Sequence, residues 1–408
     1  MSKIKDPVIL DKTGRDIVDK LHTQNLLLNI LASSAIEVAT DLKEIQRIVQ
    51  SGNAAKVFNI GDQIIVPWTD RATGTVYQVP HDVVHFQNVT LQDGETVPAM
   101  ILQWHYCTPF GVQFDAREAF FYCNTALAAG TYYVTVTGSS WGQVAAGTYQ
   151  FTTTKEVPAG GVLVFNQDIY SSGIAGGTIN SYSTRAATEA LETGIAVTAG
   201  NSGTSLGSFV AAGSPSDHLN SFQCAAYGYN RWAKSAMRQW LNSNAGVGSW
   251  WSPSHDYDRP PTELATKHGF KSGYESDFLD IVKPILVTTA LNTINDDSLE
   301  TDHLEDTYDT FFLPALNNMH INPQLAGEGD VYDYWKRVSQ SANALSQGGT
   351  YPQIRTYAIE NHNSAQNVRL RSAHRGNAHN AWHVHSSGGV SYGDATSSYR
   401  CAPVCAVC

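Results

Sequence analysis

Short apolar runs separated by turn residues fill residues 56–155, and they restrict this region to an all-β fold. The runs at 63–68, 100–106 and 132–136 contain many β-branched and aromatic residues and are too short for ordinary helices. Asp93-Gly94 and Gly138-Ser139 are turn dipeptides that separate such runs. The spacing predicts a sandwich or barrel built from short strands.

Residues 8–52 carry a different pattern, which predicts helix. Apolar side chains recur there at largely helix-compatible spacings, at Ile17, Leu21, Leu26, Leu28, Ile30, Leu31, Ile36, Val38, Leu42, Ile45 and Ile48. Ser51-Gly52-Asn53 is a helix stop. Two interpretations remain open, namely a short coiled coil that trimerises or docks on a larger assembly, and a helical hairpin that lies on the next domain.

Residues 158–408 mix helical and strand patterns. An amphipathic helix is expected over 231–242, and its apolar face consists of Trp232, Ala236, Met237, Trp240 and Leu241. A second short helix is expected over 274–282, before Pro284. The chain is therefore expected to be a multidomain α+β protein. Its predicted parts are a helical assembly segment at 1–55, a β-sandwich-like domain at 56–157 and an α+β domain at 158–408.

Charge and hydropathy exclude several classes of function. The 408 residues include 26 Lys and Arg against 37 Asp and Glu, a net charge of −11, whereas a nucleic-acid binder needs a basic footprint. No run approaches the roughly 20 apolar residues of a membrane helix. Residues 1–7 have no apolar core after their lysines, so no secretory signal is expected. The chain is therefore expected to be made in a cytoplasm. Its six cysteines are not expected to form a disulfide scaffold there.

One histidine-rich motif is a candidate metal site. His81-Asp82-Val83-Val84-His85 resembles a zinc-protease motif, but that motif needs Glu at its second position and a helix. The valines predict a strand, which could still place both histidines and His105 on one face. Three unrelated structural histidines are the simpler interpretation. The acidic stretch at 296–309 lacks the regular spacing of a calcium-binding loop and is expected to be solvated.

Three cysteines close to one another form a second candidate. The spacing of Cys401, Cys405 and Cys408 matches that of radical enzymes that hold an iron–sulfur cluster. The small apolar residues between them favour a buried strand whose thiols act as small hydrophobes. Since no nucleophile elbow, phosphate-binding loop or paired-carboxylate signature is present, we expect no enzymatic activity, no cofactor and no metal.

Residues 374–395 are the most informative part of the chain, because their polar side chains follow no order that packing would demand. Between them lies a frame of apolar and small residues, Ala378, Ala381, Trp382, Val384, Val390 and Ala395. In a strand such as 382–385, the frame is expected to face inward and the interposed residues outward. A rigid scaffold that presents adaptable polar and aromatic side chains has the composition of a recognition surface.

The expected ligand contacts share a polar, small or aromatic type on this frame. They are His374, Gly376, Asn377, His379, Asn380, His383, His385, Ser391, Tyr392, Gly393, Asp394, Ser397 and Tyr399. Tyr392 and Tyr399 are expected to be anchors whose replacement by alanine leaves the fold intact. The four histidines are expected to alter binding as they charge between about pH 7 and 5.5.

This arrangement resembles the C-terminal variable region of proteins diversified by diversity-generating retroelements, the family that includes phage major tropism determinants. In that family, mutagenised asparagine codons can become Ser, Tyr, His, Asp, Gly and several other residues, but not Lys, Glu, Gln, Met or Trp. From Ala373 to Cys408 the chain has no Lys, Glu, Gln or Met, and its one Trp lies on the frame. Leu370-Arg371-Ser372 matches the motif that opens such regions. The resemblance is specific over about 350–408, and the three cysteines in the last segment depart from it.

The resemblance implies a C-type-lectin-like fold for 158–408, with a variable region at about 370–400. It implies a phage receptor-binding protein on the virion, made in the bacterial host cytoplasm. The implied partners are a host-surface receptor, either protein or glycan, and other virion tail proteins, with the chain as a homotrimer. Two alternatives remain, an invariant carbohydrate-binding lectin-like virion protein and a formylglycine-generating-type oxidoreductase. The oxidoreductase would need a reactive cysteine pair to hold copper.

Overall fold

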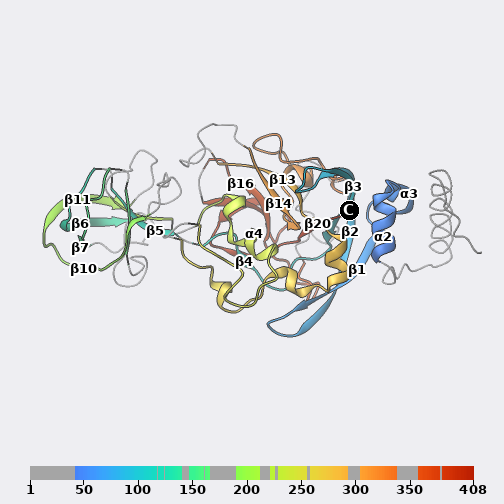
Figure 1. Cartoon of the computed structure of the whole chain (residues 1–408), viewed down its shortest axis with the longest axis horizontal. Coiled ribbons are helices and arrows are strands. Elements are labelled where there is room, and N and C mark those ends of the chain that lie inside the picture. The colour runs from blue at the N-terminus through green and yellow to red at the C-terminus, as the bar shows by residue number, and fades with distance from the viewer. Residues whose placement is uncertain are drawn as a thin grey trace, which may run out of the picture.

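The computed structural model shows a mixed α+β fold in which strands dominate (Figure 1). It describes residues 42–116, 118–123, 125–139, 147–159, 161–165, 190–211, 221–225, 228–254, 258–292, 304–337, 357–376 and 379–408. The expected α+β class is therefore confirmed at this level. No helix among the described residues is long and apolar enough to cross a membrane.

A five-stranded sheet forms the centre of the main body. Its strands, in spatial order, are β1 (Gln63–Asp70), β2 (Thr75–Thr90), β3 (Thr96–Trp104), β20 (Val404–Val407) and β15 (Phe311–Phe312). Strict alternation of exposed and buried residues in β1 turns Ile64, Val66 and Trp68 toward the core. Pro67 suits this edge strand, because proline cannot donate a ladder hydrogen bond.

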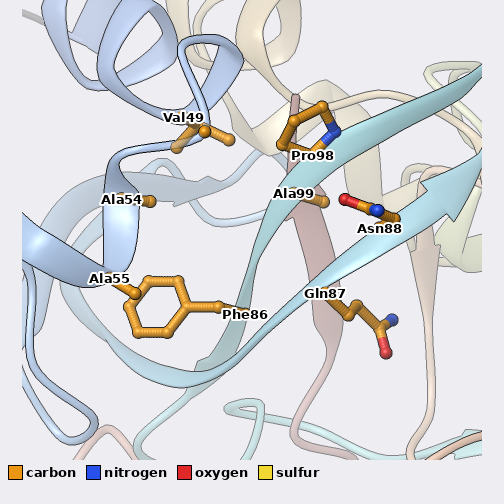
Figure 2. A pocket seen from close by; sticks show the side chains of 9 residues that line it. Val49, Ala54, Ala55, Phe86, Gln87, Asn88, Pro98 and Ala99 are labelled. Carbon is orange, nitrogen blue, oxygen red and sulfur yellow. The ribbon is translucent and has the colours of Figure 1, made fainter.

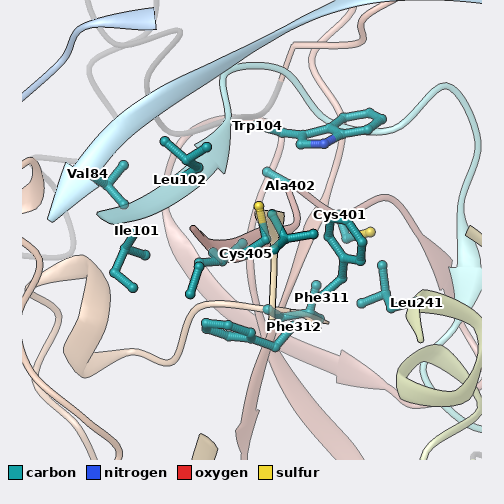
Figure 3. Packing of buried hydrophobic residues seen from close by; sticks show 14 of the residues in the cluster. Val84, Ile101, Leu102, Trp104, Leu241, Phe311, Phe312, Cys401, Ala402 and Cys405 are labelled. Carbon is teal, nitrogen blue, oxygen red and sulfur yellow. The ribbon is translucent and has the colours of Figure 1, made fainter. Parts of the chain in front are cut away.

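Strand β20 lies inside this sheet, so the last residues of the chain are part of its core. Cys405 is paired with Leu102 of β3 on one side and with Phe311 of β15 on the other (Figure 3). Residues 401–408 are all buried, and the thiols of Cys401, Cys405 and Cys408 are free. The prediction of a buried final strand with thiols as small hydrophobes is confirmed.

The helices pack against this sheet. Helix α2 (Leu42–Gln50) buries Ile45, Ile48 and Val49, and the Gln46 side chain donates a hydrogen bond to the Cys408 carbonyl oxygen at 2.7 Å. It ends at the predicted stop, where Gly52 has a φ of +71° that suits glycine. The short helix α3 (Ala54–Val57) follows. The rest of the predicted helical segment, residues 1–41, lies outside the described residues.

The amphipathic segment at 231–242 forms two short helices rather than one. They are η2 (Trp232–Lys234) and α4 (Ala236–Leu241). Ser235 separates them because its backbone is extended and its hydroxyl accepts a hydrogen bond from the Arg238 amide, which caps α4. The predicted apolar face is buried as expected. The second predicted helix is α5 (Ser276–Ile281), and the 3-10 turns η3 (Thr262–Ala265), η4 (Phe270–Gly273), η5 (Asn317–Met319) and η6 (Trp335–Arg337) complete the set.

A smaller β unit has a hydrophobic cluster of its own, which includes Val134, Phe151 and Val197. One of its sheets has the order β10-β7-β6-β11 and the other β12-β5-β8-β9. The strands are β5 (Glu118–Tyr122), β6 (Gly130–Ser139), β7 (Gly147–Thr153), β8 (Val162–Phe165), β9 (Ala190–Ile195), β10 (Val197–Ala199), β11 (Thr204–Ala211) and β12 (Ser221–Ala225). This unit projects from the main body (Figure 1).

The strand pairing does not follow the expected domain boundary at residue 157. Strands β1–β3 share the main hydrophobic cluster with residues after 228, whereas residues 123–197 supply the second cluster. The smaller unit is therefore an excursion from the main body. Its two ends meet, because a Cβ atom placed on Gly228 would lie 2.8 Å from the Asp115 carbonyl oxygen. The sequence pattern predicted strands correctly but not which strands pair.

Replacing residues 118–226 with a short Gly-Ser linker is expected to leave the main body folded. The two attachment points already touch, and each part has a separate core, so few stabilising contacts are lost. Near-ultraviolet circular dichroism and urea unfolding of the shortened chain test this, with deletion of 401–408 as the control that removes β20. A shortened chain that lacks a cooperative unfolding transition would contradict the assignment.

Candidate ligand-binding surface

The candidate residues lie on and around a three-stranded antiparallel sheet. Its strands are β16 (Val368–Ala373), β17 (Asn380–Val384) and β18 (Val390–Asp394). Two further pairs of strands flank it, β13 (Ile285–Ala290) with β14 (Leu304–Asp309), and β4 (Val112–Gln113) with β19 (Ser398–Tyr399). Strand β16 is buried throughout, so β17, β18 and the turns around them provide the accessible groups.

The register divides the candidate residues between two faces of this sheet. Trp382 is paired with Tyr392, and Asn380 with Asp394, so these four share one side, which we call the tryptophan face. His383 is paired with Ser391, which places both on the opposite side, the histidine face. The sequence predicted a single patch, because the pairing partner of each residue is not visible in a local pattern.

Three aromatic rings converge on the tryptophan face. The His374 ring stacks on Trp382 at 5.4 Å between centroids, and the Tyr392 ring stands edge-on to Trp382 at 5.5 Å. Tyr392 is 49% exposed. The exposed side chain of Gln324 accepts hydrogen bonds from the Trp382 indole and from the Arg375 amide. Burial lowers the pKa of His374, and the nearby His379 lowers it further.

The histidine face is more enclosed. His383 is only 2% exposed, and its ring lies 4.7 Å from that of Tyr399. Tyr399 in turn lies over the Arg369 guanidinium at 4.4 Å, an arrangement that favours the cation. His385 is exposed, and its Nδ1 hydrogen-bonds to the Ser387 hydroxyl at 2.8 Å. Ser391, Gly393 and Ser397 are half-buried.

Several expectations about these positions need correction. Asn380 and His383 are buried, so the expected outward orientation of the interposed residues does not hold for them. For His383 the reason is its pairing with Arg369, whose side chain lies on the same face of the sheet, whereas Asn380 lies on the tryptophan face. Tyr399 covers the Arg369 guanidinium, so its removal is not expected to leave the fold intact. Gly376 is exposed and His379 half-buried, with the His379 ring 3.2 Å from the Asp394 carboxylate, while Asn377 lies outside the described residues.

Arg369 organises the whole surface through main-chain contacts. Its guanidinium donates hydrogen bonds to the carbonyl oxygens of Ala381 at 2.8 Å, Gly393 at 3.0 Å and Asp394 at 2.8 Å. It also reaches the Ser397 carbonyl oxygen at 3.3 Å. Burial lowers the pKa of Arg369 to about 10, so the side chain stays charged at neutral pH. None of these bonds requires a particular side chain on β17 or β18.

Other side chains also bind main-chain atoms of β17, β18 and the adjoining turns, and we call these residues, with Arg369 and Arg371, the framework residues. Asn230 donates to the carbonyl oxygen of Asn380 at 2.7 Å and is itself bonded to Asn292. Asn367 accepts from the Ser386 amide at 2.9 Å. Sequence reasoning did not identify these residues or Gln324, because each acts on a main chain far from it in sequence.

Arg371 anchors the sheet to the rest of the body. Its guanidinium donates to the carbonyl oxygens of Leu313 at 2.8 Å and Glu328 at 2.6 Å, and to the Asn318 side chain at 2.7 Å. The Glu328 carboxylate accepts a hydrogen bond from Ser372 at 2.7 Å. Burial raises the pKa of Glu328, and the neighbouring Arg371 partly opposes that shift.

The histidines and cysteines that were candidates for a metal or catalytic site do not form such a site among the described residues. The three histidines have different partners, His81 with Tyr274 at 3.0 Å, His85 with Asp333 at 3.0 Å and His105 with Asp82 at 2.9 Å. No group of three metal-ligating side chains occurs within the described part of the chain. Burial raises the thiol pKa values of Cys401, Cys405 and Cys408, so these thiols are protonated at neutral pH.

A groove of about 370 Å³ lies elsewhere in the main body (Figure 2). It is lined by residues of α2, α3, β2 and β3, including Val49, Ala54, Phe86 and Pro98. None of its lining residues belongs to β16–β18 or to the turns between them. The candidate surface is therefore an open face of a sheet rather than this hollow.

Residues 216–407 match a family described as a domain of unknown function, DUF6273. No curated protein and no solved structure matches the chain. The matched range contains the three-stranded sheet together with Asn230, Asn292 and Gln324, which hold its main chain or its tryptophan.

Acidification is expected to destabilise the protein through His383. Burial first, and then the charges of Arg369 and His385, lower its folded-state pKa to about 3, against about 6.5 when unfolded. Below pH 6.5 the unfolded chain takes up a proton that the folded chain does not, so stability falls as the pH drops from 6.5 toward 3. His383 alone accounts for about 2 kcal/mol between pH 7 and 5.

Urea unfolding of the parent and of His383→Gln at pH 7 and pH 5 measures this contribution. The variant is expected to lose less stability on acidification than the parent. Equal losses in the two proteins would contradict the assignment. His383 therefore does not provide the charge change that was expected between pH 7 and 5.5.

Proposed function

We propose that the chain is a phage receptor-binding protein, and that β17, β18 and the adjoining turns present a diversifiable surface to a ligand on the host cell. In this proposal residues 158–408 form a lectin-like domain on the virion, the smaller β unit excepted. The proposed partners are a bacterial surface receptor and other virion tail proteins. The protein binds but does not catalyse a reaction.

One observation carries the proposal, namely that side chains of the framework residues hold the main chain of β17, β18 and the adjoining turns, which we call the presented segment. Arg369 and Asn230 both bond to carbonyl oxygens of this segment. Every residue except proline offers the same carbonyl and amide groups. Side chains on such a segment can therefore change while the backbone stays in place, as a diversified surface requires.

The type of side chain presented supports the same function. The exposed or half-exposed groups around the sheet include Tyr392, His385, Ser391 and Asp394. Tyrosine, serine and other small polar side chains suit recognition, since they combine contact area with adaptable hydrogen bonding at low entropic cost. From Ala373 to Cys408 the chain has no Lys, Glu, Gln or Met, the residues that diversified codons of this kind do not produce.

Multiple copies would strengthen binding by such a small surface. Linked sites raise avidity by about 10² to 10⁴ without any new contact. The apolar residues from Ile17 to Val38 remain the proposed place where three chains join, and they lie outside the described residues. Ile45 and Ile48 of α2 are instead buried in the main hydrophobic cluster of their own chain. The homotrimer is thus part of the proposal.

Two tyrosine variants test the function against a structural effect. Tyr392→Ala is expected to keep the parent's thermal stability but to bind host cells about 30-fold more weakly, since an anchor residue contributes about 2 kcal/mol. Tyr399→Ala is expected to lower stability by about 2 kcal/mol, because it uncovers the Arg369 guanidinium. Calorimetry and a cell-adsorption assay on both variants separate the two effects. Parent-like adsorption by folded Tyr392→Ala would contradict the proposal.

A further inference from the structure

We infer that the tryptophan face binds the ring of a neutral hexose in a polysaccharide of the host surface. The inference rests on the proposed function and names the chemical class of its ligand. It is carried by the ring cluster of His374, Trp382 and Tyr392, together with the polar groups at its edge. The histidine face takes no part in it.

The three rings form a rigid ledge. Centroid separations of 5.4, 4.3 and 5.5 Å hold each ring against the other two. The Trp382 indole is fixed further by its hydrogen bond to Gln324. An aromatic face carries partial negative charge, so it attracts the weakly positive C–H groups on one side of a sugar ring. A ledge that is already ordered loses little entropy when such a ring stacks on it.

Two polar groups beside the rings are available for a ligand. The Tyr392 hydroxyl makes no hydrogen bond within the described part of the chain. The Nε2 group of Gln324 is likewise without a partner among the described residues, since both hydrogen bonds of this side chain use Oε1. A hydroxyl and an amide donor next to an aromatic platform match a ligand whose apolar face is bordered by hydroxyl groups.

The charges around the ledge favour a neutral sugar over an acidic one. The arginines of this segment, Arg369, Arg371 and Arg375, are buried. The Asp394 carboxylate, 39% exposed, lies on the same face and contacts His379 at 3.2 Å. His374 accepts a hydrogen bond from the Gly376 amide through Nδ1, which leaves its other nitrogen to carry the proton of the neutral ring. A carboxylated or phosphorylated ligand would meet Asp394 and no exposed arginine from this segment.

The size of the ledge favours a sugar over a protein. A stable protein interface buries about 800 Å² on each partner around an apolar centre. The tryptophan face offers one half-exposed tyrosine, two partly covered rings and the half-buried Val390, while Val384 is fully buried. An area of this kind corresponds to one or two sugar rings.

The test measures adsorption of the full-length protein to intact host cells, to periodate-oxidised cells and to protease-treated cells. Periodate is expected to abolish adsorption by opening sugar rings, whereas protease is expected to leave it unchanged. Free neutral hexoses at millimolar concentration are expected to compete, and N-acetylneuraminic acid is not. Tyr392→Phe keeps the ring and is expected to bind within about threefold of the parent, while Tyr392→Ala falls about 30-fold. Tyr133→Ala in β6 is the matched control that leaves adsorption unchanged.

The outcomes distinguish the two claims. Adsorption that resists periodate and is lost after protease treatment overturns the sugar inference but leaves the proposed function standing. Adsorption that resists periodate and is lost at 0.5 M salt assigns the ledge to a cationic ligand and likewise overturns the inference. A folded protein that adsorbs to none of the cells overturns both.

Discussion

The candidate surface depends on the hydrogen bonds that the buried guanidinium of Arg369 donates to main-chain carbonyl oxygens. A charged group inside a protein is costly unless its hydrogen-bonding groups are satisfied. Here the carbonyl oxygens of Ala381, Gly393 and Asp394 accept hydrogen bonds from its two terminal nitrogens, and the Tyr399 ring covers it, while Nε has no partner among the described residues. One side chain thereby fixes β17, β18 and the turn that follows. Because the acceptors are main-chain atoms, these hydrogen bonds hold the backbone of this segment and do not involve its exposed side chains.

Contacts with residues that are distant in sequence fix the position of this segment in the main body. Arg371, two residues after Arg369, bonds to the carbonyl oxygens of Leu313 and Glu328. Downstream, β20 enters the central sheet between β3 and β15. The presented segment thus begins and ends at buried, hydrogen-bonded strands. Its main chain is anchored on both sides while Tyr392 and His385 remain exposed.

Local sequence patterns predicted the elements better than their arrangement. The helix stop at Gly52 and the buried strand at 404–407 follow from properties of a few neighbouring residues. The pairing of Leu102 with Cys405 joins residues about 300 positions apart, which no local period encodes. The same limit applies to the expected boundary at 157, which the strand pairing and the two hydrophobic clusters do not follow. It also explains why His383 was expected outside, since its burial depends on Arg369 in the neighbouring strand.

The most direct test compares two libraries for the fraction of variants that stay folded. One randomises His385, Ser391, Tyr392 and Ser397, whose side chains are exposed or half-buried, and the other randomises the framework residues Asn230, Asn292, Arg369 and Arg371. Protease resistance of displayed variants, read by sequencing, gives that fraction for each library. We expect most variants of the first library to resist protease like the parent and few variants of the second to do so. Equal fractions of protease-resistant variants in the two libraries would contradict the claim that hydrogen bonds to the main chain hold this surface.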